Sequence, residues 1–137
     1  MDFLGEAWLA SRAPFLVPVI LSLSVHEYAH AACAHALGDD TAARQGRLSL
    51  NPLVHLDPVG LLLPLLGVPF GWAKPVPIDP SRMRNTSMEL GLVLSAAAGP
   101  ISNLLLGFAA TLAMGVWLRL DTGAAVAGAS WQLLEMM

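Results

Sequence analysis

The sequence predicts an all-α membrane protein with polytopic helices, a re-entrant or interfacial hairpin and an extended proline-rich loop. Three observations predict this class. The 137 residues are 55% hydrophobic and 12% charged, against roughly 45–50% and about 25% in soluble domains. The mean hydropathy of +0.62 points the same way. Two apolar runs are each long enough to cross a bilayer, and a shorter run between them contains prolines.

The first long span is predicted at about residues 14–37, where Pro14 suits a helix start and Gly38 ends the apolar run. At about 1.5 Å per residue it can cross a hydrocarbon core of roughly 30 Å. The next apolar run, residues 58–70, has only 13 residues and two prolines. That length favours a re-entrant or interfacial hairpin over a full crossing.

Residues 71–80 contain three prolines and are predicted to form an extended loop. A second long span follows at about residues 90–118, and Gly99-Pro100 is expected to kink or break it. A further helix is expected to start in residues 124–137. With no repeat or low-complexity linker in the sequence, residues 1–137 are taken as a single membrane-embedded domain.

The distribution of basic residues predicts the orientation of the spans. Between the two long spans lie five basic residues, Arg44, Arg47, Lys74, Arg82 and Arg84, whereas Arg12 precedes the spans and Arg119 follows them. The central segment is therefore expected to face the cytoplasm. A full crossing by residues 58–70 would divide this count and weaken the prediction. Seven Lys and Arg and a net charge of −3 leave no basic face for nucleic acid.

The candidate chemistry lies inside the first span, in His26-Glu27-Tyr28-Ala29-His30, an H-E-x-x-H pattern. Residues four apart share a helix face, so both imidazoles can hold one zinc ion while Glu27 acts as general base. Ionisable groups inside a membrane helix are costly unless they face a polar cavity, which favours a functional site. The alternative is a hydrogen-bonded polar cluster that packs helices together.

The sequence resembles the site-2 proteases, which are intramembrane zinc metalloproteases, and their compact bacterial branch in particular. Besides the zinc pattern, the resemblance rests on residues 45–60 (QGRLSLNPLVHLDPVG), 71–77 (GWAKPVP) and 98–103 (AGPISN). It implies Zn²⁺ as cofactor, His26 and His30 as ligands, and Glu27 as catalytic base. It also implies an integral protein of the bacterial inner membrane. The count of basic residues predicts that the active site opens to the cytoplasm.

The function implied is a zinc-dependent intramembrane endopeptidase of regulated intramembrane proteolysis, cutting transmembrane or membrane-proximal helices. Its partners would be a membrane-protein substrate helix and the lipid bilayer. Two other classes stay open. One is a non-catalytic or incomplete membrane metal-binding protein that lacks the third zinc ligand. The other is a transporter, although no inverted repeat is visible.

In one respect the sequence departs from this family, whose third zinc ligand is an aspartate in a later Leu-Asp-Gly motif. Nothing after Asn103 matches that motif, so the chain is expected to be truncated before it. Asp57 is a candidate substitute ligand; alternatively it caps a helix that begins at Pro58. His55 is expected to be a polar gate or a simple interfacial residue.

Four residues are candidates for substrate binding: Trp72, Lys74, Pro75 and Asn103. The loop at 71–80 could pair with an unwound substrate by strand addition, or it could be a rigid turn anchored by Trp72. Asn103 is expected beside the helix opening at Gly99-Pro100, with plain helix packing as the competing account.

Overall fold

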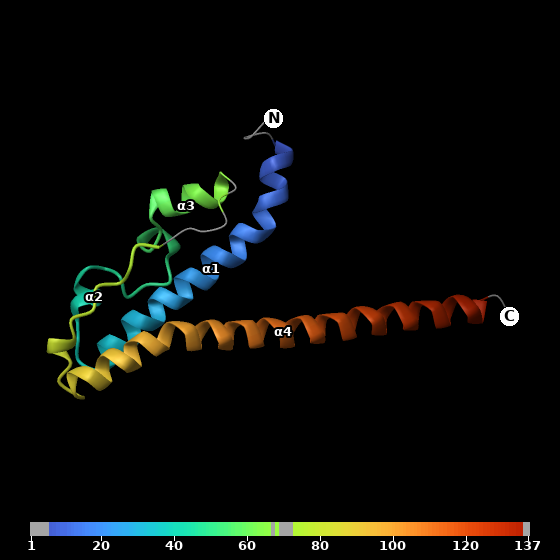
Figure 1. Ribbon diagram of the computed structural model, residues 1–137. Coiled ribbons are helices and arrows are strands. Elements are labelled where there is room, and N and C mark those ends of the chain that lie inside the picture. The colour runs from blue at the N-terminus through green and yellow to red at the C-terminus, as the bar shows by residue number, and fades with distance from the viewer. Residues whose placement is uncertain (1–5, 67, 69–72, 136–137) are drawn as a thin grey trace. The chain divides into compact units, whose positions relative to one another are not determined.

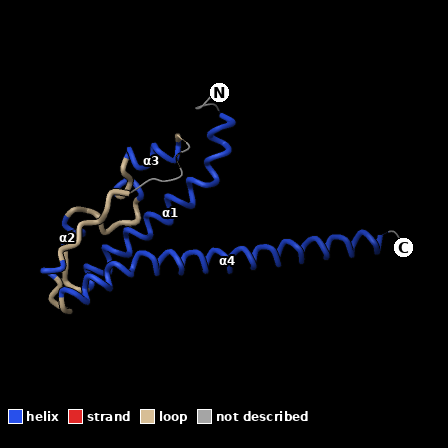
Figure 2. The backbone as a smooth tube through the Cα atoms, in the orientation of Figure 1, coloured by secondary structure: helices blue, strands red, loops and turns tan. Residues whose placement is uncertain are grey.

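The computed structural model describes residues 6–66, 68 and 73–135 (Figure 1). These residues form helices and loops (Figure 2). Their one β-type pairing is an isolated antiparallel bridge between Leu56 and Ala73. The predicted all-α class is confirmed. The elements in chain order are α1 (Glu6–Ala36), α2 (Thr41–Arg44), the 3₁₀ turn η1 (Pro52–Val54), α3 (Pro58–Leu65), the 3₁₀ turn η2 (Pro80–Arg82) and α4 (Met88–Glu135). The chain divides into two compact units, Met1–Asn103 and Leu104–Met137.

Helix α1 begins at Glu6, earlier than the start at Pro14 that the sequence predicts. Both Pro14 and Pro18 lie inside the helix. Proline's fixed φ of about −65° is helical, so each proline removes one backbone hydrogen bond without ending the helix. Residues Leu16–Ala36 are long and apolar enough to cross a membrane, by length and composition.

The end of α1 is a Schellman motif centred on Gly38, as the predicted boundary requires. Gly38 has a φ of +106°, a conformation that costs glycine little. Its N–H donates to the carbonyl of His35 at 3.0 Å, and the N–H of Asp39 donates to the carbonyl of Ala34 at 3.0 Å. A Cβ at Gly38 would lie 3.0 Å from the backbone nitrogen of Arg84, so the turn also lets the returning chain approach closely.

The returning chain joins the end of α1 to the start of α4. The side-chain amide of Asn85 donates to the carbonyl of Ala36 at 3.1 Å, and its backbone N–H donates to the carbonyl of Leu37 at 3.2 Å. Helix α4 then starts at Met88 with Ser87 as its N-cap, whose Oγ accepts from the N–H of Leu90 at 3.3 Å. The first turns of α4 therefore run back antiparallel to α1, and Figure 1 shows them side by side.

Helix α4 is continuous from Met88 to Glu135, through Gly99 and Pro100. The break expected at Gly99-Pro100 is therefore absent, since the ring of Pro100 takes a helical φ. The sequence predicts a span at 90–118 and a separate helix at 124–137. In the structure the same helix, α4, continues between them to Glu135. Residues Met88–Asp121 are long and apolar enough to cross a membrane.

The segment between the two long helices contains α3, which has eight residues and spans about 12 Å. That is too short to cross a hydrocarbon core of about 30 Å. The carboxylate of Asp57 caps it, accepting from the N–H groups of Val59 and Gly60 at 3.0 Å each. Residues 67 and 69–72, which include the candidate Trp72, lie outside the described residues, and residues 74–79 are extended without regular structure.

Asp39 ties this segment to the end of α1. It is fully buried; Oδ1 accepts from the N–H of Thr41 at 3.0 Å and from its hydroxyl at 2.5 Å, and Oδ2 accepts from the N–H of Asp79 at 2.7 Å. Burial alone would raise the pKa of Asp39. The hydrogen bonds from Thr41 and Asp79, with the nearby charge of Arg82, outweigh burial and lower the pKa below its ordinary 3.8.

Asp39→Ala is expected to lower the free energy of unfolding by about 2 kcal/mol or more, because each buried donor left unpaired costs about 1–3 kcal/mol. A lowered carboxyl pKa stabilises the fold above the unfolded pKa, and that stabilisation is lost as pH falls through the folded pKa. The difference between wild type and variant should therefore be full at pH 7 and shrink below about pH 3.8. Unfolding in detergent micelles measures it, with exposed Glu89→Ala as control; equal stability at pH 7 would contradict the assignment.

Candidate metal centre

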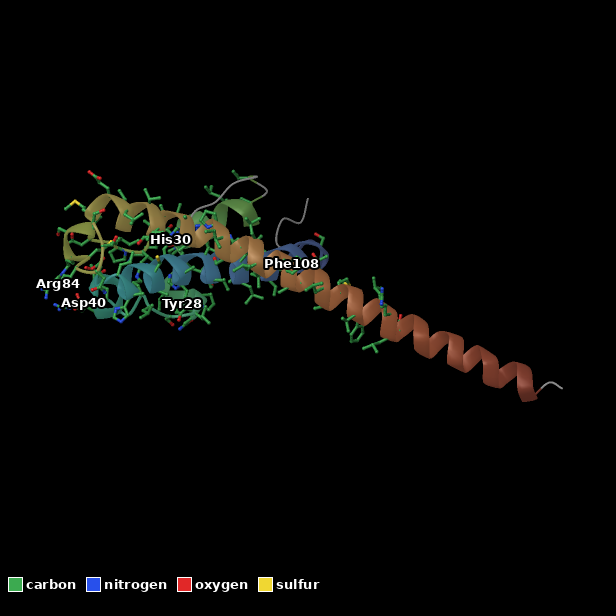
Figure 3. The ribbon with its side chains drawn as sticks, turned by 90° about the horizontal axis from the view of Figure 1, so that it is seen from below. Tyr28, His30, Asp40, Arg84 and Phe108 are labelled. Atoms are coloured by element: carbon green, nitrogen blue, oxygen red, sulfur yellow. The ribbon has the colours of Figure 1, made fainter. Side chains whose placement is uncertain are left out.

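The two histidines of the H-E-x-x-H pattern face each other on α1, as their spacing of four predicts. Their Nε2 atoms lie 3.0 Å apart, and the rings meet edge to face with centroids 4.6 Å apart. Figure 3 shows His30 between α1 and α4. Both imidazoles thus present the same nitrogen to one point on the helix face.

Helix α4 orients each imidazole through the other ring nitrogen. Nδ1 of His30 lies 2.6 Å from the carbonyl oxygen of Ser95, which can only accept. Nδ1 of His26 lies 3.1 Å from the side-chain nitrogen of Asn103, and Oδ1 of that amide accepts from the hydroxyl of Ser22 at 3.1 Å. Such partners fix ring orientation in metal sites.

The absence of a side chain at Gly99 leaves the space in front of the two imidazoles. A Cβ atom at Gly99 would lie 2.6 Å from Nε2 of His26, and it would also clash with Nε2 of His30. Only glycine allows α4 to approach α1 this closely here. Helix opening at Gly99-Pro100 and plain helix packing were the two expectations from sequence, and the close approach at Gly99 agrees with packing.

The two histidines fit zinc as nitrogen ligands. Two nitrogens bound at about 2.0–2.1 Å to one tetrahedral zinc are about 3.3 Å apart, close to the observed 3.0 Å. Because His30 donates from Nδ1 to Ser95, its Nε2 carries the lone pair that a metal needs. Among the described residues, no group of three His, Cys, Asp or Glu side chains could hold a metal together.

Glu27 turns away from the α4 contact toward the extended segment. Its side chain is buried, with 8% of the residue exposed, and Oε2 accepts from the backbone N–H of Val76 at 3.1 Å. It borders a cavity of about 570 Å³. The cavity is lined by Pro18, Val19, Ser22, Leu23, His26, Glu27, Ala73, Pro75 and Asn103. A base, one histidine and the extended segment therefore share one open space.

Of the other candidates, Pro75 lines the same cavity as Glu27 and His26, whereas Asp57, Lys74 and His55 have different contacts. Asp57 caps α3 through its Oδ1 and does not form a three-residue metal group with the histidines in the described part of the chain. The backbone of Lys74 is tied down: its N–H donates to the carbonyl of His55 at 2.9 Å, and its carbonyl accepts from Arg47 at 3.2 Å. Pro75 lines the cavity. His55 is fully buried and bonds the carbonyl of Ser49 through Nε2 at 2.7 Å.

Sequence reasoning missed Ser22 and Ser95. Ser22 is four residues before His26, so helical spacing could have identified it as a neighbour on the same face. Ser95 acts through its backbone carbonyl, and a backbone contact leaves no signal in residue type. Ser95, Gly99 and Asn103 repeat every fourth residue, the same spacing as Ser22, His26 and His30.

Comparison with known proteins finds a relative that is 50% identical over 99 residues, the "Putative zinc metalloprotease YwhC" of Bacillus subtilis (strain 168). The chain is thus similar to a protein named as a zinc metalloprotease. The match covers 72% of this chain and 44% of the relative, so the chain spans less than half the relative's length. No protein-family model matches the sequence, and no solved structure matches it.

Gly99→Ala is expected to reduce zinc affinity at least tenfold. The added methyl group would clash with both imidazoles and displace their Nε2 atoms, which now lie 3.0 Å apart. Competition with a chromogenic chelator, on the chain in detergent micelles, measures this. Gly107→Ala is the matched control on the same helix, since a Cβ there meets nothing within 4 Å. Equal zinc affinity of Gly99→Ala and wild type would remove Gly99 from the site.

Proposed function

We propose that this chain carries the zinc-binding helix and catalytic base of an intramembrane endopeptidase of the site-2 protease type. The observation that carries the proposal is the pair of His Nε2 atoms 3.0 Å apart, beside Glu27 at a cavity, inside a helix apolar enough to cross a membrane. The name of the B. subtilis relative supports zinc-dependent proteolysis. The substrate proposed is a transmembrane or membrane-proximal helix.

His26 and His30 would hold the metal through Nε2, with α4 fixing the second nitrogen of each ring. Bound zinc would polarise the scissile carbonyl and activate water as a Lewis acid. The third ligand is proposed to come from outside the described residues, because they contain no three-residue metal group. Two neutral imidazoles leave the positive charge of the metal uncompensated, so an anionic third ligand suits the site.

Glu27 would act as the general base, taking a proton from the attacking water and returning it to the leaving amide nitrogen. Its carboxylate borders the cavity next to His26. The N–H of Val76 holds Oε2, which orients the carboxylate before substrate arrives. Because Glu27 is adjacent to His26 in sequence, it points to a different side of α1 and can act without being a ligand.

The substrate must expose its backbone before it can be cut, because peptide groups in a membrane helix are hydrogen-bonded internally. Lys74 and Pro75 belong to an extended segment that borders the cavity, which suits them to receive an unwound peptide. We propose that this site lies in the bacterial inner membrane and opens to the cytoplasm. Loops rich in Arg and Lys tend to lie on the cytoplasmic side, and the segment between the spans carries five of these residues.

A non-catalytic metal-binding membrane protein is the second candidate. It is favoured by the lack of a third ligand among the described residues. It predicts the same zinc binding without hydrolysis, so zinc content and peptide cleavage measured on one preparation distinguish the two.

His26→Ala and His30→Ala are each expected to lose most of the bound zinc, since each removes one of two ligands. Glu27→Gln should retain zinc and fold but lose cleavage of fluorophore–quencher-labelled single-span peptides. Elemental analysis and fluorescence on the same samples give both readouts. Unchanged zinc in His26→Ala would overturn the ligand assignment, and full cleavage by Glu27→Gln would remove it as the base. Zinc-loaded wild type that cuts no peptide would favour the metal-binding alternative.

The orientation predicts accessibility to a membrane-impermeant thiol reagent. In a Cys33→Ala background, Gln45→Cys and Ser81→Cys, both at exposed positions between the spans, should react only after the cytoplasmic side is opened. Ser11→Cys, at the other end of the first span, is the control expected to react in sealed cells. Labelling of both central positions in sealed cells would reverse the orientation while leaving the zinc assignment intact.

A further inference from the structure

The structure holds a further cavity, of about 530 Å³, which shares no lining residue with the cavity beside Glu27. Three of the residues that line it are arginines, Arg44, Arg82 and Arg84, and we call it the arginine cavity. Arg44 belongs to α2, which follows α1, whereas Arg82 and Arg84 precede α4. A guanidinium has five N–H donors and no acceptor, so three of them around one space suit an anion.

Asp40 holds two of the arginines at this cavity. Its Oδ2 accepts from Nη2 and Nε of Arg44 at 2.5 and 2.7 Å, and its Oδ1 lies 3.9 Å from Nε of Arg82. The charge of Arg82 also acts on buried Asp39, but that carboxylate accepts its hydrogen bonds from nearby N–H and hydroxyl groups. Arg82 therefore keeps N–H donors for a further anion, since its one ion pair in the described part of the chain is this long contact with Asp40.

Arg84 is the least compensated charge of the arginine cavity. Its exposed guanidinium has no ion pair or hydrogen bond with the residues that the structure describes. The second carboxylate of the cavity, Asp79, accepts instead from the N–H and the hydroxyl of Ser81 at 3.1 and 2.5 Å. Arg84 can lie beside the end of α1 because Gly38 has no side chain, and a Cβ there would lie 3.0 Å from the backbone nitrogen of Arg84. Figure 3 shows Arg84 and Asp40 at the same end of the molecule.

The arginine cavity lies where one long apolar stretch ends and the other begins. The stretch Leu16–Ala36 finishes just before the first residue of the cavity, and the stretch Met88–Asp121 begins shortly after Arg84. In a membrane, residues this close to the ends of two spans lie at the level of the lipid headgroups. Met88 and Leu90, in the first turn of α4, are 57% and 52% exposed. They offer an apolar surface for acyl chains directly after the polar segment that lines the cavity.

We propose that the arginine cavity binds the phosphate group of an anionic membrane lipid, with Arg82 and Arg84 as its direct ligands. A guanidinium bonds two oxygens of a phosphate at once, in a fixed fork that an ammonium group lacks. The position at the ends of the spans, followed by exposed Met88 and Leu90, favours a lipid over free phosphate. The inference goes beyond the proposed proteolysis and rests only on the proposed membrane location.

Substitutions separate this site from the general attraction between basic residues and anionic lipids. Arg82→Gln and Arg84→Gln are each expected to weaken lipid binding at least fivefold, because each removes a charged bidentate donor. Arg84→Lys keeps the charge but loses the fork, and it should fall between Arg84→Gln and wild type. Lys74→Gln is the matched control and should bind within twofold of wild type. It removes the same charge from an exposed position between the spans that does not line the cavity.

The experiment titrates short-chain phosphatidylglycerol into the full chain in micelles of an uncharged detergent. The ¹⁵Nε–H signals of the arginines report binding, and circular dichroism checks that each variant is folded. Two further probes distinguish the source of the phosphate: the diacylglycerol with the same acyl chains, and inorganic phosphate. The expected result is a saturable shift of the Arg82 and Arg84 signals with the phospholipid, and at least tenfold weaker binding of both other probes.

Equal losses in Arg84→Gln and Lys74→Gln would overturn the inference, because charge alone would then explain the binding. Diacylglycerol that binds as tightly as the phospholipid would remove the phosphate from the site. Inorganic phosphate that binds as tightly would overturn the lipid as its source. Zinc content and peptide cleavage, which test the proposed function, are measured without this lipid, so either proposal can fail alone.

Discussion

The candidate site depends on one close approach, where α4 passes α1 at Gly99. Three residues on each helix, four apart, meet across it: Ser22, His26 and His30 on α1, and Ser95, Gly99 and Asn103 on α4. Because the helices are antiparallel, the first residue of one row bonds the last residue of the other. Gly99 at the centre leaves open the space where the imidazole nitrogens converge, and its neighbours one turn away orient both rings.

The contacts that fix this register lie beyond the long apolar stretch Leu16–Ala36, at the end of α1. The Schellman turn at Gly38 reverses the chain, and Asn85 bonds the last carbonyls of α1 just before α4 begins. Buried Asp39 holds the extended segment at residues 74–79 by accepting from the N–H of Asp79. A shift of one residue in α4 would rotate it by about 100° and would carry Gly99 away from the histidines. The loop contacts at the end of α1 and the hydrogen bonds between α1 and α4 therefore support the same alignment.

The sequence predicts those parts of this arrangement that depend on spacing within one helix. The pattern from His26 to His30 places both rings on one face, Gly38 marks the helix end, and apolar length marks the spans. The early start of α1 was missed because proline loses a backbone hydrogen bond inside a helix and is therefore read as a helix start. Pro14 and Pro18 nevertheless both lie inside α1. Ser95 was missed because it acts through its backbone carbonyl, and the contacts of Asn103 and Gly99 with the histidines were not predicted because they join segments that are distant in the sequence.

The two chemical groups of the pattern lie in physically different surroundings. The histidines face α4, where the backbone carbonyl of Ser95 and the side chain of Asn103 hydrogen-bond the two rings. Glu27, one residue on and about 100° around α1, faces the extended segment and is held by the N–H of Val76. Pro75 and Pro77 on either side of Val76 have no N–H to offer. Val76 therefore supplies, between two prolines, the N–H that holds the Glu27 carboxylate, and this contact is separate from the α4 contacts that hold the histidines.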